Sequence, residues 1–255
     1  MRAEDYADLH ALEDSLWWFA GMREVTAALL DPLCPAAEER LILDAGCGTG
    51  GMLSWLTRYA GRGGVAGLDL IYDALKFCRE RHEGCLVQGS ATDLPFGDST
   101  FDLVTSFDVL VQIPGEGSDE RAMREMYRVL RPGGVAFVRV AAYGWMRSGH
   151  DEALGTQRRY ARAELRRKMG GAGFRVLRTT YANSLLLPLA VVRRLVLKRV
   201  GLSDRGSDVK PLPRGLGWLN SAFEGALRSE ARLLRTGRDL PAGLSLICLA
   251  ERPRE

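Results

Sequence analysis

The fold of this chain is decided by Leu41-Ile42-Leu43-Asp44-Ala45-Gly46-Cys47-Gly48-Thr49-Gly50-Gly51. Its apolar opening reads as a buried parallel strand, and the apolar residues within 52–56 have helical spacing. Glycine at every second position between them favours a tight turn. A strand, a glycine turn and a helix start leave backbone N–H groups pointing at any ligand that approaches the turn.

The glycines of this turn fit two kinds of ligand. Gly46, Gly48 and Gly51 also have the G-x-G-x-x-G spacing of dinucleotide sites, which leaves a nicotinamide cofactor open. Asp44 stands at the end of the strand, where a carboxylate repels a pyrophosphate and attracts an ammonium or sulfonium group. The carboxylate therefore favours S-adenosylmethionine (SAM).

The sequence from Asp44 to Gly50 resembles the first motif of the class I SAM-dependent methyltransferases. In that family the loop wraps the amino-acid part of the cofactor. The resemblance therefore implies cofactor contacts by Asp44, Gly46, Cys47, Gly48 and Gly50.

A second strand over 65–70 contains the acid Asp69, followed by Leu70. A carboxylate at this spacing from the glycine turn suits hydrogen bonds from both hydroxyls of a ribose, in dinucleotide and SAM sites alike. The alternative role for Asp69 is to cap the next helix. We expect the ribose role, with Leu70 beside it.

The loop after the third strand, 85–88, resembles the family's adenine-side loop. Ser90 stands where the family pattern has an aspartate. We expect Ser90 with Ala91 and Thr92 to contact the adenine, or Asp93 to substitute for the aspartate.

A fourth strand within 99–110 and the turn 130–134 complete the resemblance, which comprises four motifs in order over residues 40–140. Because ligands sit outside the carboxyl ends of the strands in open α/β sheets, Phe107 and Gln112 should border the reacting methyl group. Gln112 can orient a substrate by hydrogen bonding but cannot act as a general base.

The N-terminal residues 6–30 have helical spacing, interrupted by Trp17-Trp18-Phe19. These aromatics either fasten the segment onto the main domain or form a lid. In the second interpretation Trp18 shields the cofactor and Arg23 reaches its carboxylate. The pattern Trp17-Trp18-Phe19-x-x-x-Arg23 resembles the opening of a bacterial methyltransferase subgroup.

Candidate catalytic residues follow the fifth strand, in an irregular segment that we interpret as a loop over the active site. His150 is a candidate general base because a histidine pKa near neutrality suits proton removal, although a solvated surface histidine is the alternative. Tyr160 and Gln112 complete the predicted set.

Composition narrows the class of protein. The chain has 255 residues, of which 46% are hydrophobic, and a formal charge of +3, which does not point to nucleic acid. Its 5 cysteines form no C-x-x-C pair, so we expect free thiols, a cytoplasmic location and no metal site. The sequence does not predict the oligomeric state.

The predicted fold class is α/β, a doubly wound, mostly parallel sheet with seven strands, an N-terminal helical leader and helical lid insertions. We divide the chain into a leader over 1–38, a SAM-binding Rossmann-like core over 39–141, and a segment over 142–255 that holds the active-site loop, lid helices and remaining strands. The resemblance implies that the last strand is antiparallel and inserted beside its predecessor.

The predicted function is transfer of the SAM methyl group to an oxygen or nitrogen nucleophile of a small molecule, leaving S-adenosylhomocysteine. The resemblance in the C-terminal half points to bacterial secondary metabolism, with a natural product or sugar as acceptor. A lipid-linked acceptor is a second possibility because residues 183–200 are apolar and basic, although contact with a membrane surface is not favoured. Two different functions also fit these residues: a nicotinamide-dependent oxidoreductase and a non-catalytic SAM-binding protein.

Overall fold

The computed structural model describes residues 3–35, 38–192 and 217–254. Its elements follow the chain in the order α1 (Ala3–Glu13), α2 (Trp17–Leu30), β1 (Leu41–Ala45), α3 (Gly51–Leu56), η1 (Thr57–Tyr59), β2 (Gly64–Asp69), α4 (Tyr72–Arg81), β3 (Cys85–Gln88), β4 (Phe101–Phe107), α5 (Ser118–Val129), β5 (Leu130–Ala141), η2 (Gly144–Met146), α6 (Gly149–Ala153), α7 (Arg162–Gly171), β6 (Arg175–Ala182), α9 (Gly217–Arg235) and β7 (Ser245–Glu251).

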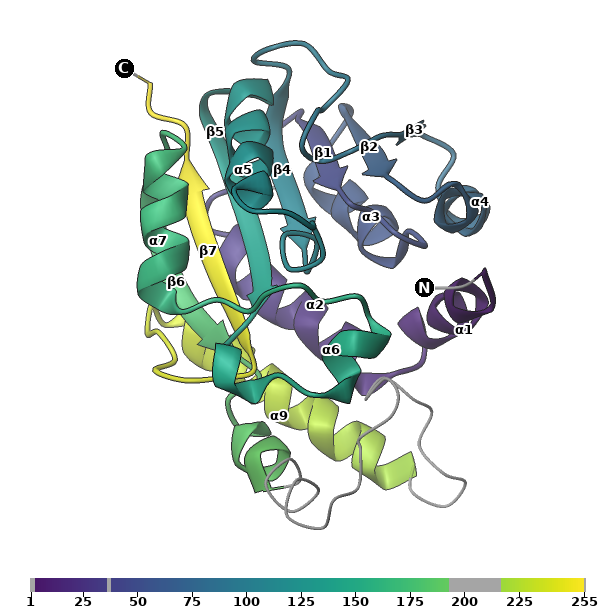
Figure 1. The fold of residues 1–255 in the computed structure, drawn as a ribbon, viewed down its shortest axis with the longest axis vertical. Coiled ribbons are helices and arrows are strands. Elements are labelled where there is room, and N and C mark those ends of the chain that lie inside the picture. Colours follow the sequence, from purple (N-terminus) through teal and green to yellow (C-terminus); the bar gives the residue numbers. More distant parts are fainter. Residues whose placement is uncertain (1–2, 36–37, 193–216, 255) are drawn as a thin grey trace.

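These elements build a seven-stranded sheet with the strand order β3-β2-β1-β4-β5-β7-β6 (Figure 1). The first five strands in this order are parallel, and β7 pairs antiparallel with both β5 and β6. The predicted fold class is confirmed, including the last strand inserted beside its predecessor.

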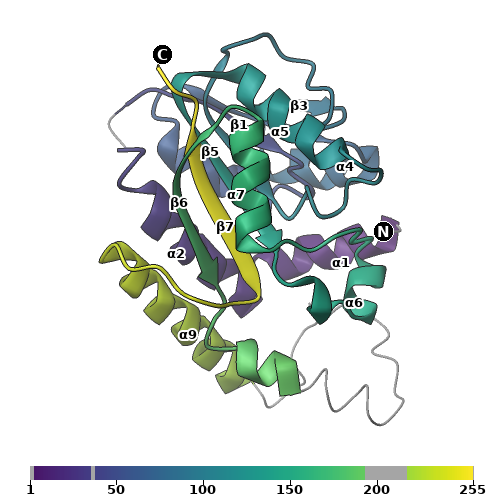
Figure 2. The same ribbon diagram turned by 60° about the vertical axis from the view of Figure 1, so that its left-hand side comes forward.

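Helices cover both faces of the sheet, which explains why its central strands are apolar on both sides. In Figure 2, α7 lies on one side of the strands and α2 and α9 lie on the other. Helix α5 packs on β5 and α7, and α9 packs on α2. The residues of β1 after Leu41 are all buried in the resulting core.

The leader forms two helices with a break at residues 14–16. The backbone N–H of Trp17 donates to Oδ1 of Asn220 in α9 across 2.9 Å, which gives the first turn of α2 a hydrogen-bond partner from far along the chain. The segment therefore begins its second helix at the aromatic run.

Two strands are longer than the sequence indicates. The 130–134 turn belongs to β5, since the N–H of Gly133 donates to the carbonyl of Arg252 and the N–H of Arg252 donates to Gly134. Strand β6 extends to Ala182 because it pairs with the whole of β7. Long-range pairing, which local residue types do not encode, sets both strand ends.

The apolar and basic segment predicted over 183–200 is described only in part. Residues 187–192 are helical, whereas the basic positions from 193 onward and most of the predicted loop 203–217 lie outside the described residues. Within the described part of the chain, every helix is too short or too polar to cross a membrane.

Candidate active site

The glycine turn after β1 has the left-handed backbone that its residues favour. Gly46 has φ +97° and Gly48 has φ +53°, a region that costs most other residues strain. A Cβ on Gly46 would lie 2.1 Å from Val109, whereas a Cβ on Gly48 would meet no described atom within 4 Å. The backbone is therefore packed on one side at Gly46 and open to an incoming ligand at Gly48.

Asp69 closes this turn from the end of β2. Its Oδ2 accepts the N–H of Gly48 at 2.9 Å, and its Oδ1 accepts the N–H of Ile71 at 2.9 Å. Burial raises the pKa of this carboxyl above its usual value. The carboxylate thus lies at the turn, and its remaining lone pairs can accept hydroxyl groups.

Asp44 is fully buried at the end of β1. Its Oδ1 accepts the hydroxyl of Thr105 at 2.7 Å, but its Oδ2 has no hydrogen-bond partner among the described residues. Burial raises the pKa of Asp44 to about 7. Because a buried carboxylate oxygen without a donor is costly, this side chain is suited to a cationic partner.

Cys47 presents only its backbone to the turn. Its side chain is buried, and a Cβ on Gly67 would lie 2.9 Å from its Sγ. The thiol therefore packs against β2, and a cofactor contact by Cys47 requires its main chain.

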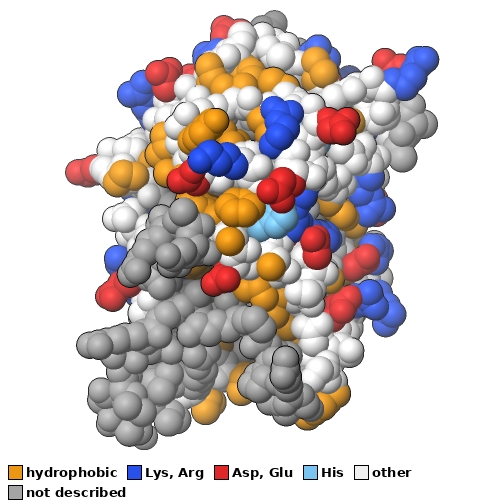
Figure 3. All heavy atoms as spheres, turned by 90° about the vertical axis from the view of Figure 1, so that its right-hand side faces the viewer, with side chains coloured by type: hydrophobic (Ala, Val, Ile, Leu, Met, Phe, Trp, Pro, Cys, Tyr) orange, Lys and Arg blue, Asp and Glu red, His pale blue; other side chains and the backbone are white. Residues whose placement is uncertain are grey.

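Beside Asp69 the surface is apolar. Leu70 is 62% exposed and Tyr72 is 59% exposed. Figure 3 shows hydrophobic side chains among charged ones on the side of the molecule that carries α1 and α4. An adenosine group that covered Leu70 would bury apolar area now in water.

The predicted adenine-side loop is internally bonded. The hydroxyls of Ser90 and Thr92 lie 2.8 Å apart, and the N–H of Thr92 donates to Ser90 Oγ at 3.2 Å. Ala91 is buried and Asp93 is exposed. Ser90 therefore shapes the turn, and Asp93 faces solvent.

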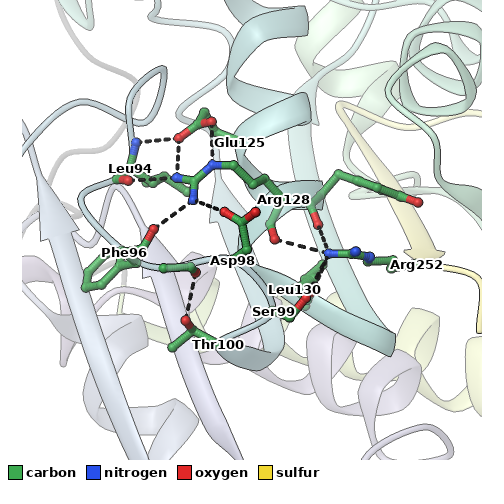
Figure 4. Close-up of polar contacts among 11 residues, drawn as sticks. Leu94, Phe96, Asp98, Ser99, Thr100, Glu125, Arg128, Leu130 and Arg252 are labelled. Carbon is green, nitrogen blue, oxygen red and sulfur yellow. Dashed lines mark hydrogen bonds and ion pairs between the residues drawn. The ribbon is translucent and has the colours of Figure 1, made fainter.

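Arg128 of α5 holds the continuation of this loop (Figure 4). Its guanidinium donates to the carbonyls of Leu94 and Phe96 at 2.9 and 2.8 Å and pairs with Asp98 and Glu125. A single side chain thus fixes the path from β3 to β4, a role that nothing in the sequence near Arg128 indicates.

At the ends of β4 and β5, Trp18 lies over an ion pair between buried Arg139 and partly exposed Asp108. Arg139 Nε donates to Asp108 Oδ2 at 2.8 Å, and the guanidinium carbon lies 4.7 Å from the Trp18 ring centroid and 5.0 Å from that of Phe107. Trp18 and Phe107 are therefore brought together at the carboxyl edge of the sheet, with a cation between their rings.

The three adjacent aromatics point to different neighbours. The Trp17 ring lies 5.2 Å from that of Phe223 in α9, whereas Phe19 is buried and meets Trp18 edge to face at 4.9 Å. One aromatic fastens the leader to α9, and another lies at the site.

Arg23 fastens the leader to the glycine turn. Its Nη2 donates to the carbonyl of Glu13 at 3.2 Å and to the carbonyl of Gly51 at 3.1 Å. Both bonds use the same nitrogen, and Arg23 Nε is buried without a hydrogen-bond partner among the described residues. The contact with a cofactor carboxylate therefore stays a prediction.

The predicted catalytic residues occupy different environments. Gln112 is exposed on the loop after β4. The backbone of His150 lies in α6, and its side chain is outside the described part of the structure.

Tyr160 is fully buried, and its hydroxyl donates to Asp119 at 2.6 Å. A phenol in this position cannot touch an acceptor, so the structure gives Tyr160 a structural role and argues against the catalytic one.

Hydrogen bonds hold the segment 142–160 against the loop that carries Gln112. Arg158 donates to the carbonyls of Ile113 and Gly115 and also pairs with buried Asp119 of α5, while Arg159 pairs with buried Asp151 within the segment. Beside these side chains lies a cavity of about 60 Å³. The segment therefore lies beside the loop after β4, where the active-site interpretation places it.

Together these residues fit SAM. The unpartnered Asp44 Oδ2 suits a positive charge, the open side of Gly48 admits a ligand, and exposed Leu70 beside Asp69 suits an adenosine. Among the described residues, no group of three or more His, Cys, Asp or Glu side chains is placed to hold a metal ion.

Comparison with known proteins agrees with this geometry. Residues 43–138 match the methyltransferase domain family. A segment of the chain is 41% identical over 100 residues to the fatty-acid O-methyltransferase of Mycolicibacterium smegmatis, and another match is 40% identical over 125 residues to the malonyl-[acyl-carrier protein] O-methyltransferase of Pectobacterium atrosepticum. These matches cover 38% and 48% of this chain, and only 35% and 47% of the relatives.

Solved structures share the whole fold at low identity. A structure of the Haloferax volcanii Trm112 methyltransferase activator with a methyltransferase includes a chain that aligns with a TM-score of 0.63 and 21% identity, covering 98% of this chain and 96% of that chain. The cyclase SpnF aligns with a TM-score of 0.56 and 18% identity, covering 91% and 81%. The fold alone therefore does not fix the reaction.

The similarity to methyltransferases in sequence is confined to the matched segment, which contains the whole glycine turn, Asp69 and the loop after β3. Residues 43–138 match the methyltransferase domain family and lie within a seven-stranded sheet, so this part of the chain is similar to methyltransferases in sequence.

Proposed function

We propose that the protein transfers the methyl group of SAM to an oxygen nucleophile of a small molecule. The observation that carries this proposal is the carboxylate of Asp69 bonded to the N–H of Gly48 at a turn that is open on the Gly48 side, within the segment matched by the methyltransferase family. Asp44, Gly46, Gly48, Asp69 and Leu70 are the residues that we assign to the cofactor.

When bound, SAM supplies a methyl group already activated by its sulfonium. The tasks left to the protein are to align the acceptor and to exclude water. Trp18 and Phe107 at the carboxyl edge supply apolar surface for both tasks. Exposed Gln112 is placed on the adjoining loop, where its amide can orient an acceptor.

The names of the relatives support an oxygen acceptor of the acyl or lipid class. Both relatives compared above are named O-methyltransferases, one of fatty acids and one of a malonyl-carrier protein. They give no support to a natural product or sugar. The family match ends at residue 138, before the segment 142–160 that we interpret as lying over the active site, so acceptor identity needs its own test.

A lipid at a membrane surface is a second candidate acceptor. Leu185, Leu189 and Val192 are 58%, 57% and 58% exposed around the helical residues 187–192. Exposed aliphatic side chains on one short segment suit contact with acyl chains. Methyl-transfer activity that rises several-fold when anionic vesicles are added would favour this candidate. Equal activity with and without vesicles would show that the reaction needs no membrane surface.

The experiment is methyl transfer from isotopically labelled SAM to a panel of acceptors: long-chain fatty acids, a malonyl thioester, a simple phenol and a sugar. The proposal expects label in an acyl acceptor that disappears in Asp69→Ala. Label found only in the phenol or the sugar would show that the acceptor is not of the acyl class. Failure to bind S-adenosylhomocysteine at all would overturn the proposal itself.

A further inference from the structure

A carboxylate from the leader lies at the glycine turn. Glu13, the last residue of α1, is 7% exposed, and a Cβ placed on Gly51 would lie 2.5 Å from its carboxyl carbon. Gly51 begins α3 directly after the turn. The leader therefore delivers an acidic group to the place where the sequence predicts only Trp18 and Arg23.

The Glu13 carboxyl is incompletely satisfied. Its Oε2 lies 3.5 Å from Arg81 Nη1, an ion pair longer than a good hydrogen bond, and it has no hydrogen-bond partner among the described residues. Arg81 directs its closer contact to Asp14, at 2.9 Å. Burial raises the pKa of Glu13, although the Thr49 hydroxyl and the charges of Arg81 and Arg23 act in the opposite direction.

A second unsatisfied carboxylate lies across the same turn. Asp44 is fully buried with its Oδ2 unpartnered, and Glu13 is among the charges that act on it. Arg139 acts on Asp44, and Thr49, Arg81 and Arg23 act on Glu13. Asp44 Oδ2 and Glu13 Oε2 nevertheless have no hydrogen-bond partner among the described residues, so both oxygens can accept from a positively charged donor.

We propose that Glu13 is a cofactor-binding residue, which with Asp44 receives the α-ammonium group of SAM. The inference rests on the proposed function and deepens it. An ammonium has three donors, so it satisfies both unpartnered carboxylate oxygens at once. The leader then forms one wall of the cofactor site, held in register by the bond from Arg23 to the carbonyl of Gly51.

The test compares two ligands that differ in one group: S-adenosylhomocysteine and its analogue without the α-amino group. Calorimetric titrations use the full chain and Glu13→Gln. Loss of a charged hydrogen bond weakens binding about tenfold to a hundredfold. We expect Glu13→Gln to weaken the binding of S-adenosylhomocysteine by this factor and to change the affinity for the analogue less than about twofold. The four affinities form a double-mutant cycle in which the amino group of the ligand takes the place of the second residue.

Two control variants distinguish recognition of the amino group of the ligand from packing of the leader against the core. Asp14→Asn removes the neighbouring acid, whose side chain is 69% exposed, and Arg81→Gln breaks the ion pair from the other side. Both should leave the preference for the amino group unchanged. If Glu13→Gln weakens both ligands equally, or Arg81→Gln reproduces its effect, Glu13 serves leader docking alone and the inference is wrong.

The outcomes also separate this inference from the proposed function. If the unaltered chain binds neither ligand, the proposed function itself fails. If it binds S-adenosylhomocysteine and Glu13→Gln binds it equally well, the cofactor assignment stands and only the role of Glu13 is lost.

Discussion

The carboxylate of Asp69 accepts the backbone N–H of Gly48 across 2.9 Å, which joins the end of β2 to the turn that follows β1. The same carboxylate accepts the N–H of Ile71, just before α4. One side chain therefore fixes the glycine turn and the start of the next helix, and it does so beside the face where we place the ribose.

We expect Asp69→Asn to raise the Kd for S-adenosylhomocysteine at least about tenfold, because the amide removes one acceptor and turns a donor toward backbone N–H groups. Calorimetric titration measures the effect. Asp73→Asn is the matched control, since Asp73 is a nearby acid in α4 that pairs with Lys76. Equal effects of the two substitutions would contradict the assignment.

The buried charge of Asp44 predicts a pH dependence. Its folded pKa of about 7 lies above the usual 3.8, so the folded state binds more protons between these values. Stability of the free protein should therefore fall as pH rises from about 4 to about 7 and then level off. Burial is the largest cause of this raised pKa. Thr105 and Arg139 lower it, and Asp69 and Glu13 raise it further.

Asp44→Asn tests this directly. Because the variant has no buried charge, we expect its free energy of unfolding at pH 8 to be roughly 1–3 kcal/mol higher than that of the original protein. The affinity for S-adenosylhomocysteine should fall at least about tenfold. Urea titrations at pH 5 and pH 8, with and without the ligand, measure both. A variant less stable than the original at pH 8 would show that the carboxylate is satisfied by groups already present.

Tyr160→Phe should separate structure from catalysis. Loss of the buried hydroxyl leaves Asp119 with Lys168 and Arg158, so we expect a loss of about 1–2 kcal/mol in the free energy of unfolding. The rate constant of methyl transfer at saturating substrates should change less than about twofold. A large fall in that rate with unaltered stability would restore the catalytic role.

Arg128→Gln should loosen the loop between β3 and β4. We expect faster amide hydrogen exchange over residues 90–98 and weaker binding of S-adenosylhomocysteine, since two carbonyls and two acids lose their shared donor. Arg124→Gln, an exposed position on the same helix, is the control. Unchanged exchange in the loop would mean that other contacts hold it.

The parts that the sequence predicted correctly are those that neighbouring residues determine. The apolar run before Gly46 predicts a strand, and the glycines that follow predict a turn. Predicted strands then alternate with predicted helices along the chain, which indicates a mostly parallel sheet. The resemblance implied that the last strand is antiparallel and inserted beside its predecessor, and the structure confirms this.

Contacts between segments far apart in the chain could not be predicted from the sequence. Trp17 and Asn220 are 203 positions apart, and Tyr160 reaches Asp119 across 41 positions. A tyrosine in an irregular segment looks exposed when only its neighbours are known, and a glutamate in a leader helix looks solvated. Burial of Tyr160 and Glu13 depends on packing that the local pattern does not encode.

Calorimetric titration with S-adenosylhomocysteine and separately with NAD, repeated for Asp44→Ala and Asp69→Ala, decides whether this turn binds a SAM-type cofactor. We expect micromolar binding of S-adenosylhomocysteine, weakened by both substitutions, and no binding of NAD. Binding of NAD, or of neither ligand, would contradict this expectation.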